Sequence, residues 1–355
     1  MNEWKKVKFL DFIVLQRGFD LTKDSIKDGP YPVVCSTSIM GYHNDYKVEG
    51  PGVVTGRSGT LGKTQYVKGN FWPHNTTLFV KDFKGNNRQF VYYFLKNFDI
   101  ASMGGGAAIP SLNRNVLSNL SVTIPDLSIQ NNIANILSRY DSLIENYQKQ
   151  IKLLEEAAQR LYKEWFVDLH FLGHENTKIV NGVPEGWEKS NINNMLTFHR
   201  GYDLTHKDFI DGPYPVVGST SIIGCHNKYK IEGPGIVTGR SGSLGVYQLI
   251  WENFWPHNTS LYISDFKEHE VFFIYCMLKT VDFTTLNSGG AIPSLNRNTL
   301  SNILVVEPPK DLQQDFSRKA IPLFKKQKTL QSQIRLLTEA RDRLLPKLMS
   351  GEMAV

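Results

Sequence analysis

An unbroken heptad pattern between Gln130 and Phe166 limits what this chain can fold into more than any other feature of its sequence. Apolar residues recur there at alternating steps of four and three, the spacing that packs one helix against another along a single seam. Charged residues fill the opposite side, so we expect that side to face water. At about 1.5 Å per residue the helix is roughly 50 Å long, and its seam needs a partner. The expected seam residues are Ile133, Leu137, Tyr140, Ile144, Tyr147, Ile151, Leu154, Ala158, Leu161 and Trp165.

The partner helix lies in the same chain. A second heptad pattern follows 183 positions later, and most of its seam residues are again apolar. Its two polar seam positions, Gln327 and Arg341, are predicted to fix the register of the helix pair at some cost in stability. Pro322 is predicted to kink or restart this helix near its beginning. The apolar seam residues expected here include Leu323, Leu330, Ile334, Leu337, Leu344 and Leu348.

The globular parts of the chain are duplicated with the same offset. The segment Arg17–Thr22 recurs as Arg200–Thr205, and Phe71–Thr76 recurs as Phe254–Thr259. A period this long indicates a duplicated domain rather than a solenoid repeat. One long helix leaves the first domain and the other returns from the second, so we predict that the helices pair antiparallel, with Leu154 and Leu337 in the shared seam.

The predicted fold is therefore an α+β chain of two similar mixed α/β domains with short strands. The domains are separated by two long helices that form an antiparallel coiled coil, and an approximate two-fold axis relates the halves. In the first domain, short runs bounded by glycine and proline predict strands over 53–55, 64–67, 76–80 and 120–124, and a buried helix over 90–96. The expected boundaries are 1–127 for the first domain, 128–166 for the first long helix, 167–185 for a linker, 186–310 for the second domain and 311–350 for the second long helix.

Composition narrows the class of partner. The net charge of +6 and the pI near 9.0 favour a polyanionic partner. Cys35, Cys225 and Cys276 lack the spacing of a zinc site and differ between the two copies, which fits a reducing cytoplasm. The first residues do not form a signal peptide, and no apolar run approaches the ~18 residues of a membrane span. We therefore expect a cytoplasmic protein with no membrane partner.

Both copies lack a recognisable catalytic or cofactor site. Gly56–Thr64 superficially resembles a phosphate-binding loop, but the first required glycine falls on Arg57, and Gly245–Tyr247 of the second copy lacks the lysine and the hydroxyl. The duplicated histidines have no Glu or Cys at metal-ligand spacing beside them. No Ser-His-Asp set or paired-carboxylate site is kept in both copies. We expect no metal, no cofactor and no catalytic residue in this chain.

Loops rich in arginine, asparagine, histidine and small hydroxyl side chains are kept in both copies. Arg57 and Arg240 lie in glycine-bracketed turns, from which an arginine can reach a guanine edge or a phosphate. Each residue alone fits ordinary turn chemistry, but the duplicated set on a basic chain favours contact with DNA. The candidate DNA-binding residues are Ser36, Thr37, Ser38, His43, Arg57, Ser58, His74, Asn75, Asn113, Arg114, Ser219, Thr220, Ser221, His226, Arg240, Ser241, His257, Asn258, Asn296 and Arg297.

Several motifs resemble those of the specificity subunits of Type I restriction–modification systems. Ile124–Leu127 leading into Gln130–Ala134 resembles the entry to the central helix of that family, and Glu307–Pro309 leading into Gln313 repeats it. Val183–Trp187 resembles the start of the second target-recognition domain. The resemblance covers nearly the whole chain, and the combination of motifs is specific although each one alone is weak.

This resemblance implies a DNA-reading protein without catalysis of its own. Each target-recognition domain would read one half of a split double-stranded DNA site, and the helices would serve as a spacer of fixed length. The subunit would recruit two methyltransferase subunits and, through the holoenzyme, the restriction subunits. S-adenosylmethionine, ATP and Mg would be bound by those partner subunits.

The matching loops also predict the form of the DNA site. A protein two-fold axis maps onto a DNA dyad, so like domains read like half-sites, and we expect a near-palindromic site whose half-site centres lie roughly one DNA turn, ~34–36 Å, apart. The alternative is a coiled-coil scaffold that joins two protein-binding domains and has no DNA specificity. A steep salt dependence of duplex binding would separate the two. A stand-alone nuclease is disfavoured because no carboxylate site is duplicated.

Overall fold

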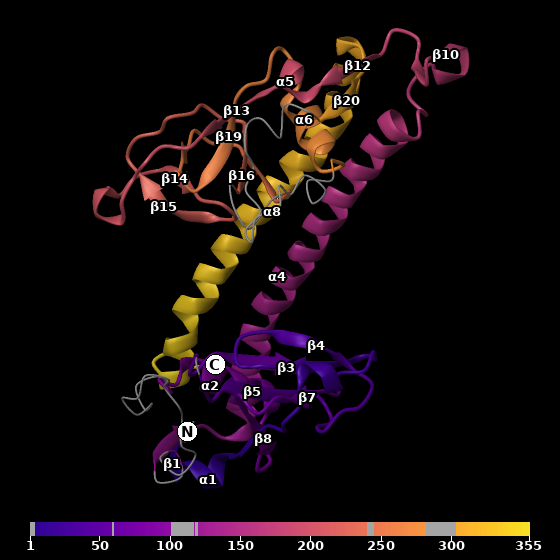
Figure 1. The fold of residues 1–355 in the computed structure, drawn as a ribbon. Helices are drawn as coiled ribbons and strands as arrows, with labels where there is room; N and C mark the ends of the chain where they lie inside the picture. Colours follow the sequence, from indigo (N-terminus) through magenta and orange to yellow (C-terminus); the bar gives the residue numbers. More distant parts are fainter. Residues whose placement is uncertain (1–3, 59, 101–116, 118–119, 240–244, 282–302) are drawn as a thin grey trace. The chain divides into compact units, whose positions relative to one another are not determined.

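The computed structural model describes residues 4–58, 60–100, 117, 120–239, 245–281 and 303–355. These residues divide into two compact units. Unit 1 comprises Met1–Gln148 together with Ser332–Val355, and unit 2 comprises the single stretch Lys149–Gln331. The C-terminal end of the chain, yellow in Figure 1, therefore belongs to the same unit as the indigo N-terminal domain.

Two sheets form the globular part of unit 1. The four-stranded sheet contains, in spatial order, β2 (Val14–Arg17), β8 (Thr77–Asp82), β5 (Gly52–Gly56) and β6 (Thr64–Val67), all antiparallel to their neighbours. The three-stranded sheet contains β4 (Ile39–His43), β3 (Tyr31–Val34) and β7 (Trp72–Pro73), with β3 and β7 parallel. The remaining elements are the antiparallel pair β1 (Lys5–Lys8) and β9 (Ser121–Ile124), the helices α1 (Phe9–Phe12) and α2 (Arg88–Asn97), and the 3-10 turn η1 (Lys23–Ser25).

Unit 2 repeats this arrangement strand for strand. Its four-stranded sheet contains β13 (Thr197–Arg200), β19 (Ser260–Asp265), β16 (Gly235–Gly239) and β17 (Tyr247–Ile250). Its three-stranded sheet contains β15 (Ile222–His226), β14 (Tyr214–Val217) and β18 (Trp255–Pro256). The remaining elements are the pair β12 (Glu188–Asn191) and β20 (Leu304–Glu307), the helices α5 (Ile192–Met195) and α6 (Val271–Leu278), the 3-10 turns η4 (His174–Asn176) and η5 (His206–Asp208), and the hairpin β10 (Ile179–Val180) and β11 (Val183–Pro184).

The strand predictions for the first domain are confirmed. The four predicted runs coincide with β5, β6, β8 and β9, and the predicted short helix lies within α2. The side chain of Asn87 accepts a hydrogen bond from the backbone N–H of Phe90 at 2.9 Å, which explains where α2 begins.

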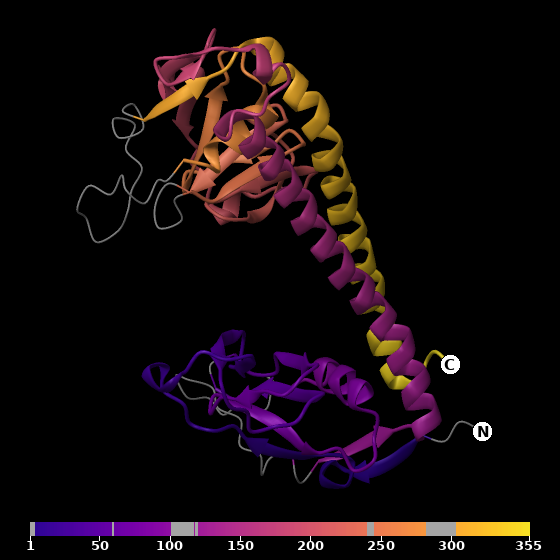
Figure 2. The same ribbon diagram turned by 90° about the vertical axis from the view of Figure 1, so that its right-hand side faces the viewer.

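Two long helices link these domains. Helix α4 (Leu127–Tyr162) continues into the π-helical segment η3 (Lys163–Val167), and α8 spans Lys310–Ser350. In unit 1 the beginning of α4 packs with the end of α8, because Ile133 and Leu137 share one apolar cluster with Leu348. In unit 2 the end of α4 packs with the beginning of α8, because Trp165 and Phe316 share another. The helices are therefore antiparallel within each unit, as the magenta and yellow helices in Figure 2 illustrate.

Every expected seam residue lies on a side of its helix that is shielded from water. Ile133, Leu137, Ile144, Ala158, Trp165, Leu330 and Leu348 are buried. The half-buried seam residues are Tyr140, Tyr147, Ile151, Leu154, Leu161, Leu323, Ile334, Leu337 and Leu344.

The two polar seam positions have partners. The amide of Gln327 donates to the backbone oxygen of Ile151 at 3.1 Å, and the guanidinium of Arg341 donates to Asp141 at 2.6 Å. The predicted restart at Pro322 is wrong, since α8 is continuous through that position. Pro322 and Arg318 are both exposed, so the turn in which the proline removes a helical hydrogen bond lies on the solvent side of α8.

Buried glutamines attach the first turn of each long helix to its own domain. The amide of Gln130 donates to the carbonyl oxygen of Pro125 at 3.0 Å, and that of Gln313 donates to Pro308 at 2.9 Å. The Gln130 carbonyl also accepts the backbone N–H of Asn87 at 3.0 Å. Because both side chains are buried, these bonds fix the angle at which each helix leaves its domain.

We expect the apolar seam to stabilise the fold strongly. Leu137→Ala removes a side chain that is 0% exposed and is expected to lower the free energy of unfolding by about 2–5 kcal/mol. Leu143→Ala, on the same helix but 42% exposed, is the matched control and should change it by less than about 0.5 kcal/mol. Denaturant titration followed by circular dichroism measures both. Equal effects of the two substitutions would show that the seam is not a packed core.

Candidate nucleic-acid interface

The sheet registers of unit 1 bring four loops to one edge. Gly56 at the end of β5 faces Thr77 at the start of β8, and Arg17 at the end of β2 faces Leu78. In the other sheet, Val34 at the end of β3 lies beside Pro73 at the end of β7. The segments that follow these strand ends therefore emerge together. We call them the loop edge of unit 1, which comprises residues 17–22, 35–38, 57–58 and 74–76.

A buried serine ties three of these loops together. Ser36 Oγ lies 2.8 Å from the carbonyl oxygen of Thr76 and 3.0 Å from that of Ser58, and it can donate to either. The backbone N–H of Arg57 donates to the same Thr76 oxygen at 2.9 Å. Ser36 is therefore a structural centre of the loop edge, and its neighbours Thr37 and Ser38 are the exposed residues of that turn.

Histidine joins the fourth loop to the others. His74 Nε2 lies 3.2 Å from the carbonyl oxygen of Leu21, and Nδ1 lies 3.2 Å from Thr76 Oγ1. A carbonyl oxygen can only accept, so Nε2 donates to Leu21, while Nδ1 shares a hydrogen bond with the Thr76 hydroxyl. In unit 2, His257 makes the same two contacts, at 3.0 Å to Leu204 and 2.9 Å to Thr259. Both rings hold loops in place.

A trio made of an exposed arginine, an exposed aspartate and a half-buried asparagine lies beside this histidine in both units; we call it the charged trio. The Asn75 amide donates to Asp20 Oδ1, which also accepts from Arg17 at 3.0 Å. The hydrogen bond from Asn75, followed by the charge of Arg17, lowers the pKa of Asp20 despite some desolvation. Unit 2 has the same trio, formed by Asn258, Asp203 and Arg200, with 3.1 Å between the arginine and the carboxylate.

Four residues of these trios are absent from the list of sequence-based candidates. Arg17, Asp20, Arg200 and Asp203 lie in the duplicated Arg17–Thr22 segment and its copy, so a signal was present. An aspartate in a turn is not by itself a candidate for DNA binding. Only the fold shows that Asn75, from another loop of the loop edge, donates a hydrogen bond to Asp20.

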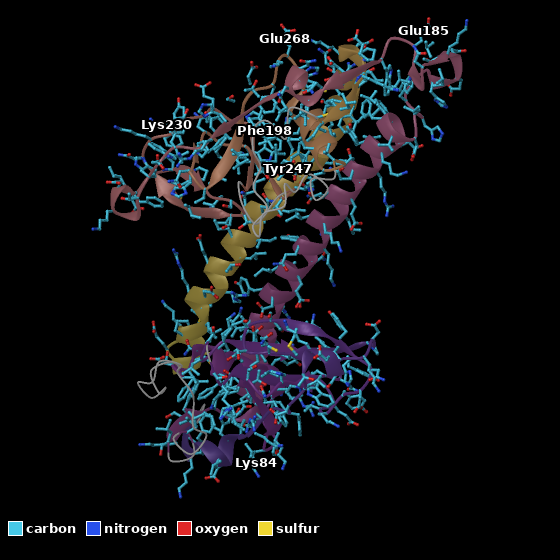
Figure 3. All side chains as sticks on the ribbon, in the orientation of Figure 1. Lys84, Glu185, Phe198, Lys230, Tyr247 and Glu268 are labelled. Carbon is cyan, nitrogen blue, oxygen red and sulfur yellow. The ribbon has the colours of Figure 1, made fainter. Side chains whose placement is uncertain are left out.

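Lysines over tryptophan rings were also missed. Lys47 Nζ lies 4.7 Å from the centre of the Trp72 ring, and Lys230 Nζ lies 4.8 Å from that of Trp255. Both tryptophans are in the strands that lead into the loop edges, β7 and β18. The loop edge of unit 2 comprises the equivalent described residues, 200–205, 218–221 and 257–259. Each contact places a positive charge at the same position in its unit; Lys230 is labelled in Figure 3.

Two of the candidate histidines are interior residues. His43 and His226 are buried, and their rings pack against Trp72 and Trp255 with centres 5.3 and 5.1 Å apart. His43 Nδ1 also accepts the backbone N–H of Lys27 at 3.0 Å. We therefore leave both out of the interface.

The other candidates are spread over the loop edges. Arg57, Ser58 and Asn75 are half-buried. In unit 2, Ser219 Oγ donates to the carbonyl oxygen of Thr259 at 2.9 Å, as Ser36 does to Thr76 in unit 1. The exposed residues of that turn are Thr220 and Ser221. The candidates Asn113, Arg114, Arg240, Ser241, Asn296 and Arg297 lie outside the described residues.

Polar and charged side chains of the loop edges suit binding to a polar partner. Within the described ranges, no group of three or more His, Cys, Asp or Glu residues could hold a metal ion. The same part of the chain has no helix long and apolar enough to cross a membrane. Two like domains with equivalent polar loop edges, carried on one pair of helices, define a two-domain recognition protein.

Comparison with known proteins identifies the family. The model of the Type I restriction modification DNA specificity domain matches the chain twice, over residues 1–156 and 184–335. The chain therefore belongs to this family, and its function is DNA sequence specificity in a restriction–modification system.

Relatives and solved structures agree with this result. The MjaIX specificity subunit of Methanocaldococcus jannaschii is 27% identical over 299 residues, covering 75% of this chain and 69% of the relative. A putative type I specificity subunit of Mycoplasma pneumoniae is 24% identical and covers 89% of this chain and 88% of its own length. The crystal structure of a Type-I restriction-modification S subunit from M. genitalium has the same fold, with a TM-score of 0.64 at 21% identity over 98% of this chain and 96% of that one.

Close contact between loops makes glycine necessary at position 18. A Cβ atom on Gly18 would lie 2.1 Å from the carbonyl oxygen of His74, so Gly18→Ala must push the two loops apart. We expect it to lower the free energy of unfolding by about 1–3 kcal/mol and to weaken DNA binding. Gly69→Ala is the matched control, because nothing lies within 4 Å of its Cβ position. Denaturant titration and DNA-binding assays on both variants test this, and an unchanged Gly18→Ala protein would contradict the proximity of the loops.

Proposed function

We propose that the two loop edges each read one half of a bipartite, near-palindromic DNA site. The observation that carries the proposal is the repetition of one hydrogen-bonded loop arrangement in both units. His74 and His257 have the same acceptors, and Ser36 and Ser219 have the same carbonyl partner. Loops held in the same conformation present their exposed side chains in the same way, so they favour similar half-sites.

Specific base contacts are assigned first to the charged trios. The carboxylate of Asp20 repels phosphate but can accept from the amino group of cytosine, and Arg17 beside it can donate to guanine. Both side chains are about half exposed or more, at 50% for Arg17 and 71% for Asp20. A trio of opposite charges therefore suits a base edge better than the DNA backbone, whereas Arg57 and Lys47 suit phosphates.

The chain is proposed to act as the recognition subunit of a larger enzyme. Two methyltransferase subunits would bind along the paired helices and supply S-adenosylmethionine, and restriction subunits would supply ATP- and Mg-dependent steps. The isolated chain is then expected to bind DNA without methyl transfer, cleavage or ATP hydrolysis. Ile151→Asp together with Leu154→Asp would open the helix pair and prevent recruitment of these partners.

Arg57 provides a direct test of the loop edge. Because Arg57 is assigned to a phosphate, Arg57→Ala is expected to weaken duplex binding about equally for all sequences and to reduce the slope of log affinity against log salt by about 1. Lys84, labelled in Figure 3, follows the opposite end of β8, so Lys84→Asn is the matched control of equal charge change. Asparagine is chosen because Lys84 has a φ of 51°. Fluorescence anisotropy at several salt concentrations measures both, and equal losses would remove the loop edge from the interface.

The form of the DNA site can be read from methylated adenines in the source genome. We expect two short half-sites, reverse complements at most positions, around a fixed unspecified gap. Deleting this gene should abolish methylation at those sites. Half-sites of unrelated sequence would show that specificity comes from residues outside the matching loops.

A further inference from the structure

Among the described residues, polar contacts between the first repeat (residues 4–166) and the second (residues 187–350) include four that involve α4. Arg341 donates to Asp141 at 2.6 Å, and Gln327 donates to the backbone oxygen of Ile151 at 3.1 Å. Glu155 accepts from the Tyr275 hydroxyl at 3.2 Å and forms an ion pair with Lys279. In every one of these contacts the acceptor is on α4 and the donor is in the second repeat. In these four contacts the hydrogen-bond donors and cations all come from the second repeat.

The Asp141–Arg341 pair is largely withdrawn from water. The side chains are 24% and 13% exposed. The Tyr93 hydroxyl donates to the other oxygen of Asp141 at 2.5 Å. Burial, followed by its bond to Asp141, raises the pKa of Tyr93. A charge in such a place is costly to leave without its partner.

The corresponding place in unit 2 is apolar. The residues 183 positions away from Asp141 and Arg341 are Phe324 and Ala158, which are 1% and 0% exposed in one apolar cluster. The Phe324 ring packs against Phe272 with ring centres 5.5 Å apart. Equivalent positions of the helix pair thus hold an ion pair in unit 1 and apolar side chains in unit 2.

The Glu155–Lys279 ion pair is present in unit 2 and has no counterpart at the equivalent positions of unit 1. In unit 1 the equivalent positions hold Thr338 and Lys96, so the carboxylate is present only on α4. Desolvation, followed by the nearby charge of Arg341, lowers the pKa of Lys96. Both carboxylates of these ion pairs are in the first repeat, and both of their cations are in the second.

We propose that this distribution makes the helix of the first repeat pair with that of the second and prevents either from pairing with another copy of itself. The internal repeat makes such homotypic pairing sterically plausible, because each long helix could take the place of the other. Pairing two second repeats would place Arg341 against Phe324, which leaves it only Asp342 of its own helix. The same pairing would leave Lys279 beside Thr338 without the carboxylate that Glu155 supplies. Pairing two first repeats would place Asp141 against Ala158. Only heterotypic pairing gives Asp141, Arg341, Glu155 and Lys279 each a partner of opposite charge in the other repeat.

The partner that fits the seam of α4 is therefore a helix with the second repeat's residues. The apolar seam supplies most of the attraction and does not distinguish the two repeats, because both have Leu, Ile and aromatic residues along it. Selectivity comes from the few charged positions, at which the wrong pairing leaves a partly buried charge uncompensated. This inference concerns the helix pair and does not depend on the DNA that the loop edges bind.

The test uses the full chain, cut once in its connector. A protease site is inserted between Glu175 and Asn176, which are both exposed, and the folded protein is cleaved so that each repeat becomes a separate polypeptide. Isotope-labelled and unlabelled cleaved proteins are then mixed. The mixture is kept at the lowest urea concentration at which labelled and unlabelled pieces exchange between complexes. Native mass spectrometry then counts the complexes. The heterotypic complex is expected to outnumber either homotypic complex by more than about tenfold, which corresponds to about 1.4 kcal/mol.

A symmetric variant removes the charge pattern. Tyr93→Cys, Asp141→Phe, Arg341→Ala and Glu155→Thr give each unit the residue that the other has at the equivalent position. Homotypic complexes are expected to approach a statistical mixture in this variant. The matched control exchanges the charges, Asp141→Arg with Arg341→Asp, and is expected to stay heterotypic.

A single substitution covers the case in which the symmetric variant does not fold. Arg341→Glu places two carboxylates together in the native pairing. In a pair of second repeats, position 341 would lie beside Phe324 and close to Lys279, just as Arg341 is close to Lys96 in unit 1, so the new carboxylate would gain a cation. Complexes of two second repeats are therefore expected to increase. The proposal is overturned if the wild-type pieces form homotypic complexes in statistical proportion. It is equally overturned if either the symmetric variant or Arg341→Glu remains as heterotypic as the wild type while label exchanges.

Discussion

Each hydrophobic core of this protein is completed by a helix that belongs to the other repeat. The first domain packs on the beginning of its own helix, but Leu345, Leu348 and Met349 from the end of the chain are part of the same cluster. The second domain packs on the beginning of α8 and also on Tyr162 and Trp165 of α4. Neither repeat buries its apolar surface alone. Helix pairing is thus a condition for folding of both domains and not merely a link between them.

The recognition surface depends on this framework through the sheets. Gln130 and Gln313 hold the helices to the domains, and the strand registers then determine which loops emerge side by side. Within a loop edge, buried or half-buried groups such as Ser36 and His74 make hydrogen bonds to backbone oxygens. Those bonds leave the neighbouring exposed side chains in a fixed arrangement. Preorganised loops on a rigid scaffold lose less entropy when they bind DNA.

Much of the fold could be predicted from sequence because periodicity reports burial directly. The heptad positions and the short strands of the first domain follow from spacing, and the offset of 183 gives the duplication. The functional residues are harder, because their roles depend on which distant loops meet. His43 and His74 are both duplicated histidines followed by asparagine, yet one packs in the interior and the other clamps two loops. Nothing local in the sequence separates them.

Pro322 shows the limit of a local rule in the opposite direction. A proline within a helix removes one hydrogen bond, and on sequence alone that favours a break. Here α8 continues because the affected turn is on the solvent side while the opposite side packs against Tyr162 and its neighbours through Phe316 and Ala320. Tertiary packing on one side of a helix outweighs a local defect on the other.

The composition of the two units also sets an order for synthesis on the ribosome. Unit 2 is one uninterrupted stretch, Lys149–Gln331, whereas unit 1 needs Ser332–Val355 in addition to the first part of the chain. The domain of unit 1 is translated before unit 2 and therefore keeps part of its apolar surface uncovered until Ser332–Val355 have left the exit tunnel. Unit 2 can therefore finish folding before unit 1, although the domain of unit 1 is synthesised earlier. That domain is the one that a chaperone would hold for longest.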